Sequence, residues 1–207
     1  MDRRAFVSRC GCSAAAAWML LLDEPAQGEN KPADEKVPDK PEKNSKHESP
    51  MIPFNEALVC SVFGFIDSDL DEAVRQQIFE YMGRTEASIE PIRSWILQHK
   101  DRFKVLYDNV NIHHKSPYWE KLVYDTDNNT IEVIGRPVTR CVCPLSQCDT
   151  PPKSLCTHCC KSFQKTCFEM ILGLPVSVRI DEAFLLGGKR CSTTIRVDGN
   201  LPPLGES

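Results

Sequence analysis

The sequence predicts one α+β domain, in which N-terminal helices precede an antiparallel sheet with a cysteine-rich loop and a helix packed on it. Apolar residues recur at helical spacing from residue 54 to residue 110, whereas from residue 119 they mostly alternate as they do in strands. Cysteine is also concentrated, since 7 of the 11 cysteines fall between Cys141 and Cys167. We expect the domain to occupy residues 54–198, which is long enough for a hydrophobic core of its own.

The first half of the domain is expected to be helical. The apolar segment Phe54–Phe65 predicts a first helix. Ser68, with an acidic residue three positions later, predicts the start of a second helix that ends at Gly83. Two further helices are expected to begin near Ser88 and after Asp101.

Strands and one more helix are expected to follow. Segments 119–124 and 130–134 flank a run of turn residues and predict a hairpin. The apolar stripe from Phe163 to Ile171 predicts a helix that ends at Gly173. We expect this helix to pack on the sheet through its apolar stripe.

The end of the domain is expected to form strands. Alternation of apolar residues over 176–180 predicts a strand. Segments 183–186 and 191–197, joined by a turn at Gly187-Gly188, predict a second hairpin. The polar residues 199–207 predict a loose tail.

The N-terminus carries an export pattern. Arg3, Arg4 and Phe6 precede an apolar run from Gly11 to Leu22, which resembles a bacterial twin-arginine signal. A general secretory signal is the alternative. We expect residues 1–28 to be a cleaved signal peptide, residues 29–53 to be a charged, proline-rich disordered linker, and the protein to reach the periplasm or cell envelope with no stable membrane span.

The overall charge argues against nucleic acid as a partner. The chain has 25 basic and 29 acidic residues, which give a formal net charge of -4. Such a chain lacks the broad basic surface that neutralises several phosphates. Nucleic acid is therefore not an expected partner.

Four cysteines have a spacing that favours a metal site. Cys141 and Cys143 form one half, and Cys156 and Cys159 form the other half in a tight turn. Thiolates in two such pairs are ligands that zinc prefers in tetrahedral sites. We therefore predict a zinc ion bound by these four residues.

Three other interpretations of the cysteines stay open. Disulfides suit an exported protein. An iron-sulfur cluster or a dithiol at Cys156 and Cys159 would make the domain a redox protein. Some thiols can pack as small apolar groups, for which Cys167 and Cys191 are the best candidates, and Cys60 is also expected to be mainly structural.

Several blocks of the sequence resemble a known set of bacterial proteins. In order, the blocks are Met82-Gly83-Arg84, Cys141-x-Cys143-Pro144, Leu155-Cys156-x-x-Cys159, Phe163, Phe168-Glu169-x-x-x-Gly173-x-Pro175-Val176 and Gly187-Gly188-x-x-Cys191-x-x-x-Ile195. The chain resembles the L-2-amino-thiazoline-4-carboxylic acid hydrolase-like proteins and the more distant 4-vinyl reductase domains. This resemblance implies an α+β domain with a small-molecule pocket and a cysteine-rich zinc site, in which Cys191 is a distant additional ligand.

The sequence favours binding over catalysis. An exported zinc-binding domain that binds a small molecule needs no catalytic base, whereas a metal- or thiol-dependent hydrolase of a small cyclic amide or thiazoline-type acid needs a base within reach. His158 is expected to support the metal ligands from a second sphere, and Glu169 is expected to be an exposed helix residue. No nucleophile triad or phosphate-binding loop is evident.

Overall fold

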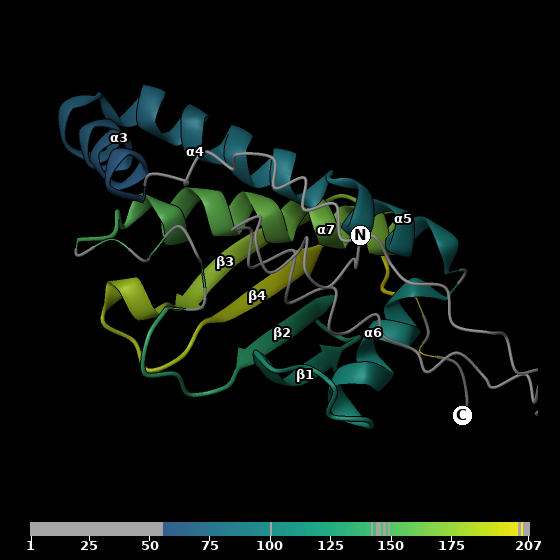
Figure 1. The fold of residues 1–207 in the computed structure, drawn as a ribbon. Coiled ribbons are helices and arrows are strands. Elements are labelled where there is room, and N and C mark those ends of the chain that lie inside the picture. The colour runs from purple at the N-terminus through teal and green to yellow at the C-terminus, as the bar shows by residue number, and fades with distance from the viewer. Residues whose placement is uncertain are drawn as a thin grey trace, which may run out of the picture.

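The computed structural model describes residues 56–99, 101–141, 143, 146, 148, 150–202 and 204. The predicted signal peptide and linker lie outside these residues. The described chain begins with helices and continues into a four-stranded antiparallel sheet, on which one long helix lies (Figure 1). The predicted α+β class is therefore confirmed.

Four helices precede the sheet: α3 (Glu56–Asp69), α4 (Glu72–Ala87), α5 (Glu90–Gln98) and α6 (Arg102–Asn111). The predicted start of α4 at Ser68 is wrong, because Ser68 still belongs to α3 and its hydroxyl donates to the Gly64 carbonyl at 2.8 Å. Asp71 caps α4 instead, and its Oδ1 accepts the Val74 N–H at 3.0 Å. Aspartate and serine cap helices about equally well. The sequence therefore predicted the right kind of capping residue at the wrong position.

The sequence predicted that α4 ends at Gly83, but Gly83 lies buried inside the helix. A Cβ atom at this position would lie 2.2 Å from the Cys159 carbonyl oxygen and 2.8 Å from the Phe163 nitrogen. The glycine is therefore required by the close approach of two helices and not by a helix end.

The sheet contains β1 (Trp119–Asp125), β2 (Thr130–Gly135), β3 (Val176–Glu182) and β4 (Ser192–Val197), in the order β1-β2-β4-β3. The first predicted hairpin, β1 with β2, is confirmed. The second differs, because β3 pairs directly with β4 and the segment expected as its first strand contains the 3-10 turn η3 (Phe184–Leu186). In that turn the N–H groups of Leu186 and Gly188 both donate to the Ala183 carbonyl, so the chain has already left the sheet.

Helix α7 (Lys161–Leu172) covers the sheet, and Gly173 ends it with a left-handed φ of 68°. Its buried face includes Cys167 and Phe168, which are fully enclosed in a core with residues of α5, α6 and all four strands. The prediction that Cys167 packs as an apolar group is confirmed.

The first residues of the predicted loose tail are packed. Leu201 is buried in the main core, and its N–H donates to the Asn129 side chain at 3.2 Å. The Tyr124 hydroxyl donates to the Pro202 carbonyl. These contacts fasten the end of the sheet where β1 turns into β2.

Candidate functional site

A cavity of about 100 Å³ lies at one end of the sheet. Its walls come from α4, from the π-helix η2 (Leu155–Cys160), from the start of α7, and from residues of β1, β2 and β4. Most of the wall is apolar and includes Trp119, Val133 and Phe163. The cavity is thus enclosed by both layers of the fold, where small molecules commonly bind.

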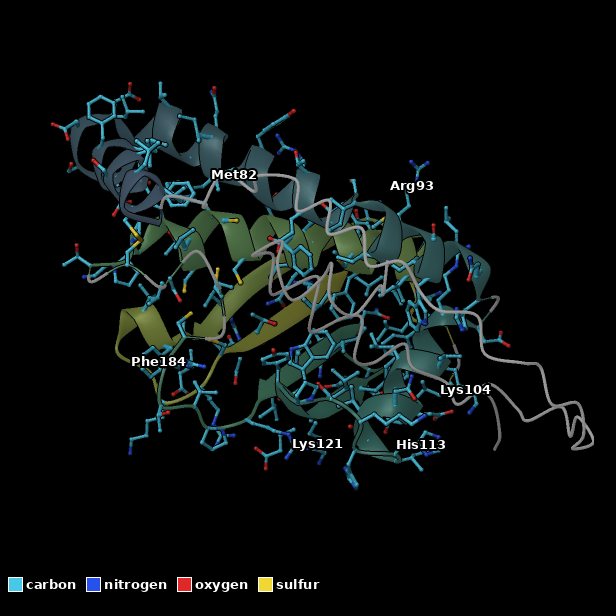
Figure 2. The ribbon with its side chains drawn as sticks, viewed as in Figure 1. Met82, Arg93, Lys104, His113, Lys121 and Phe184 are labelled. Carbon is cyan, nitrogen blue, oxygen red and sulfur yellow. A yellow bond between two sulfur atoms is a disulfide. The ribbon has the colours of Figure 1, made fainter. Side chains whose placement is uncertain are left out.

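Six cysteines line this cavity: Cys141, Cys143, Cys156, Cys159, Cys160 and Cys191. The structure therefore brings together all four cysteines predicted as zinc ligands and adds two more. Figure 2 shows several sulfur atoms in the region between Met82 and the segment that carries Phe184. Cys191 was expected to be mainly structural, and its place in the wall comes from its position directly before β4.

The segment from Cys156 to Cys159 was predicted to be a tight turn, but it is helical. Residues Leu155–Cys160 form a π-helix that continues directly into α7. Leu155 and Cys159 are buried against Phe63 and Phe79, in a second small core below α3 and α4. That packing anchors the π-helix while Cys156 and Cys160 also line the cavity, and π-helical turns are frequent at functional sites.

Cys141 and Cys156 are in direct contact through a hydrogen bond between their side chains. Both residues are buried, with 7% and 5% of their surface exposed. The bond to Cys141, together with burial and the neighbouring Cys160, raises the pKa of Cys156 far above its usual value. Burial likewise raises the pKa of Cys160 and, against an opposing backbone hydrogen bond from Phe184, that of Cys191. At neutral pH these three side chains are therefore uncharged thiols.

The thiols match zinc in kind but not in their present arrangement. Thiolate sulfur is a preferred zinc ligand. Within the described part of the chain, however, no three His, Cys, Asp or Glu side chains form a group that could hold a metal ion. The four predicted ligands line one cavity without forming a ready coordination sphere.

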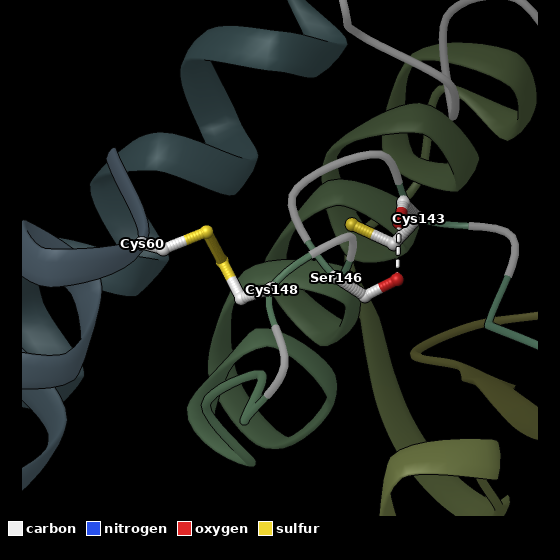
Figure 3. The surroundings of a disulfide bond; sticks show 4 residues. All are labelled: Cys60, Cys143, Ser146 and Cys148. Carbon is white, nitrogen blue, oxygen red and sulfur yellow. Dashed lines mark hydrogen bonds between the residues drawn. A yellow bond between two sulfur atoms is a disulfide. The ribbon is translucent and has the colours of Figure 1, made fainter. Parts of the chain in front are cut away.

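A disulfide joins the cysteine-rich segment to the helical layer. Cys60 of α3 is bonded to Cys148, at a sequence separation of 88 residues (Figure 3). Close to it, the Ser146 N–H donates to the Cys143 carbonyl at 3.0 Å. The disulfide interpretation is thus confirmed for this pair, although no spacing in the sequence indicated which cysteines would bond.

The two polar residues considered from the sequence do not line the cavity. His158 Nε2 lies 3.3 Å from the Glu72 carboxylate. Glu169 lies 3.9 Å from Lys165 and accepts the Val176 N–H at 3.4 Å, so it stabilises the junction of α7 with β3. Within the described part of the chain, the ion pair of His158 with Glu72 does not support the expectation that His158 acts on the cysteines from a second sphere.

Other polar residues of the cavity were missed from the sequence. They are Glu86, Tyr118, Arg136, Gln164 and Thr193. Thr193 is buried, and its hydroxyl donates to Gln164 Oε1 at 2.6 Å across the gap between sheet and helix. None of them belongs to a spacing motif, because they come from α4, from α7 and from residues in or next to the strands, which only the tertiary fold brings together.

No profile of a known protein family matches the chain, and no curated protein matches it either. Among solved structures, the chain is similar to the trafficking protein particle complex subunit 3 from Naegleria fowleri, whose structure has palmitic acid covalently bound. The two share 14% sequence identity over 72% of this chain and 98% of the other, with a TM-score of 0.45. Among the described helices, none is both long and apolar enough to cross a membrane.

Proposed function

We propose that this protein is a small-molecule-binding domain whose ligand occupies the cysteine-lined cavity. The observation that carries this proposal is the cavity itself, which has a largely apolar wall and a few polar groups between the helical layer and the sheet. Binding sites for small molecules have this composition. An apolar cavity of such a size accommodates about one aromatic ring.

Export remains part of the proposal. The twin-arginine-type pattern at Arg3 and Arg4 lies outside the described residues. The Cys60–Cys148 disulfide supports an oxidising compartment, because such bonds persist outside the reducing cytosol. A periplasmic or cell-envelope location agrees with both features.

Zinc binding by Cys141, Cys143, Cys156 and Cys159 is a second proposal. Its support is that all four residues line one cavity, although they come from two separate segments. A zinc ion would replace the four thiol protons and link the loop to the π-helix. The sulfurs would have to move closer together for this to happen, so zinc content needs its own measurement.

The hydrolase and redox alternatives have less support. Attack by a cysteine requires a thiolate, and the raised pKa of Cys156 keeps that side chain protonated at neutral pH. The contact of Cys141 with Cys156 makes those two residues a pair that a redox protein could use. The resemblance to thiazoline-acid hydrolases therefore bears on the pocket more than on the reaction.

Binding of benzyl alcohol tests the proposed cavity. We expect the alcohol to raise the melting temperature of the protein and to shift the NMR signals of Phe163 and Trp119. Val138→Phe should abolish both effects by filling the cavity, since Val138 is part of its wall. Val74→Phe is the matched control, because Val74 is 40% exposed on α4 and lies outside the cavity wall. Binding that survives Val138→Phe would contradict the proposal.

Metal analysis of protein purified without a metal-affinity tag tests the zinc proposal. About one zinc per chain should be present, and Cys156→Ser should remove it. Cys167→Ser is the control, because Cys167 is fully buried in the core away from the cavity. A protein that stays free of zinc after reduction and incubation with one equivalent of the metal would contradict this second proposal.

A further inference from the structure

The cavity wall contains an arginine whose charge has no partner in the described structure. Arg136 directly follows β2 and lines the cavity beside Tyr118 and Trp119. Its backbone N–H donates to the Tyr118 carbonyl at 2.7 Å, and its Nε–H donates to the Ser116 carbonyl at 3.2 Å. The side chain is therefore held in place from the sheet side by a neutral acceptor.

In the described part of the chain, Arg136 differs from a nearby arginine, Arg190, in that only Arg190 forms an ion pair. Arg190 forms an ion pair with Glu120 at 3.1 Å. Among the described residues, no carboxylate lies within ion-pair distance of Arg136, and its remaining guanidinium N–H groups donate to no described acceptor. Glu86 also lines the cavity, but it acts electrostatically on the thiols of Cys160 and Cys167 and forms no ion pair with Arg136.

An anionic group on the ligand would complete this arrangement. A guanidinium group binds carboxylate through two parallel N–H···O bonds, and such bonds are stronger where water is partly excluded. Aromatic rings of Trp119 and Phe163 lie in the same wall and can contact a flat ligand body. The volume of about 100 Å³ limits that body to roughly one ring.

We infer that the cavity takes a small aromatic monocarboxylate, with the carboxylate on Arg136 and the ring against Trp119 and Phe163. This inference rests on the proposed function, since it names the class of ligand for the same cavity. It assigns Arg136 as the residue that selects an acid over a neutral molecule of the same shape.

Benzoate and benzyl alcohol distinguish the two proposals, because they share a ring and differ in charge. Isothermal titration of the purified protein should show that benzoate binds about tenfold or more tightly than benzyl alcohol. Arg136→Gln should remove that preference, because it should weaken binding of benzoate much more than binding of benzyl alcohol. Arg136→Lys should retain part of the preference, since it keeps the charge but loses the paired hydrogen bonds.

Arg140→Gln is the matched control, because Arg140 is an exposed arginine four positions away that does not line the cavity. It should leave both affinities unchanged. Equal affinity of the wild-type protein for the two compounds, or a benzoate preference that survives Arg136→Gln, would overturn the inference while the cavity proposal stands. Failure of both compounds to bind would overturn the two together.

Discussion

The two ends of the sheet differ in how completely the space beneath α7 is filled. At one end, Phe168, Leu106 and Ile195 are fully buried in a continuous core. At the other end, where η2 leads into α7, the same two layers enclose a cavity. One half of α7 therefore packs in the core, whereas the other half lines a space that a ligand can occupy.

Cysteine shows the difference between these two ends most directly. Cys167 lies in the filled half and has 0% of its surface exposed, so it acts as a small apolar side chain. Cys156 lies less than four helical turns earlier, in the cavity wall, where it contacts another thiol. The residue type alone does not decide its role, whereas the space around it does.

The largest expected effect comes from making a hole in the filled half. Phe168→Ala should lower the free energy of unfolding by about 4 kcal/mol, because it leaves an empty space in the closed core. Val138 is half-buried in the cavity wall, so Val138→Ala should lower the free energy of unfolding by less than about 1 kcal/mol. Urea unfolding of both variants measures this contrast, and equal losses would show that the two halves are packed alike.

The disulfide should be the next largest contribution. Reduction of Cys60–Cys148 should lower the free energy of unfolding by about 3 kcal/mol, in the middle of the range that disulfides typically contribute. Unfolding curves with and without reductant measure it. The double variant Cys60→Ala/Cys148→Ala should be as unstable as the reduced protein and insensitive to reductant, and a response to reductant in that variant would mean that other cysteines are bonded.

Gly83 tests how closely α4 approaches η2. Gly83→Ala should cost about 2 kcal/mol, because the new Cβ would meet the Cys159 backbone. Gly64→Ala is the matched control on α3, where nothing lies within 4 Å of the added atom, and it should be neutral or stabilising by up to about 1 kcal/mol. If chemical denaturation shows similar effects of the two changes, α4 does not approach η2 as closely at Gly83 as described.

The smallest expected effect is a pH dependence from Cys167. Burial holds the pKa of its thiol well above the usual value, and Glu86 adds to this shift. The unfolded thiol ionises near pH 8.5 while the folded one keeps its proton, so the stabilisation is complete below about pH 8.5 and is lost as the pH rises. Between about pH 9 and 10, the free energy of unfolding should fall with rising pH in the wild-type protein. In Cys167→Ala this fall should be less steep, by up to about 1.4 kcal/mol per pH unit. Identical slopes in both proteins would contradict this role of burial.

The sequence was informative wherever local periodicity decides the structure. The helical stripe of α7 and its end at Gly173 could be predicted, because apolar spacing and a glycine after the last turn are local features. The end of α4 could not, since Gly83 meets residues that are 76 or more positions away in the chain. The 3-10 turn at Phe184–Leu186 was missed because its apolar residues also match a strand.

The candidate site was only partly predictable for the same reason. The clustered cysteines were evident from their density, and their place in one cavity agrees with that signal. Arg136 carries no motif and enters the cavity because β2 ends beside β1 and β4. Cys191 and Thr193 reach the same wall through the pairing of β4 with β2, which alternation within one strand cannot show.

A crystal structure of the protein grown with benzyl alcohol tests the central claim most directly. We expect the ring of the alcohol in the cavity, in contact with Phe163 and Trp119 and close to the thiols of Cys141 and Cys156. The core around Phe168 should not change. A cavity that is closed by its own side chains, with the alcohol bound elsewhere or absent, would contradict the account.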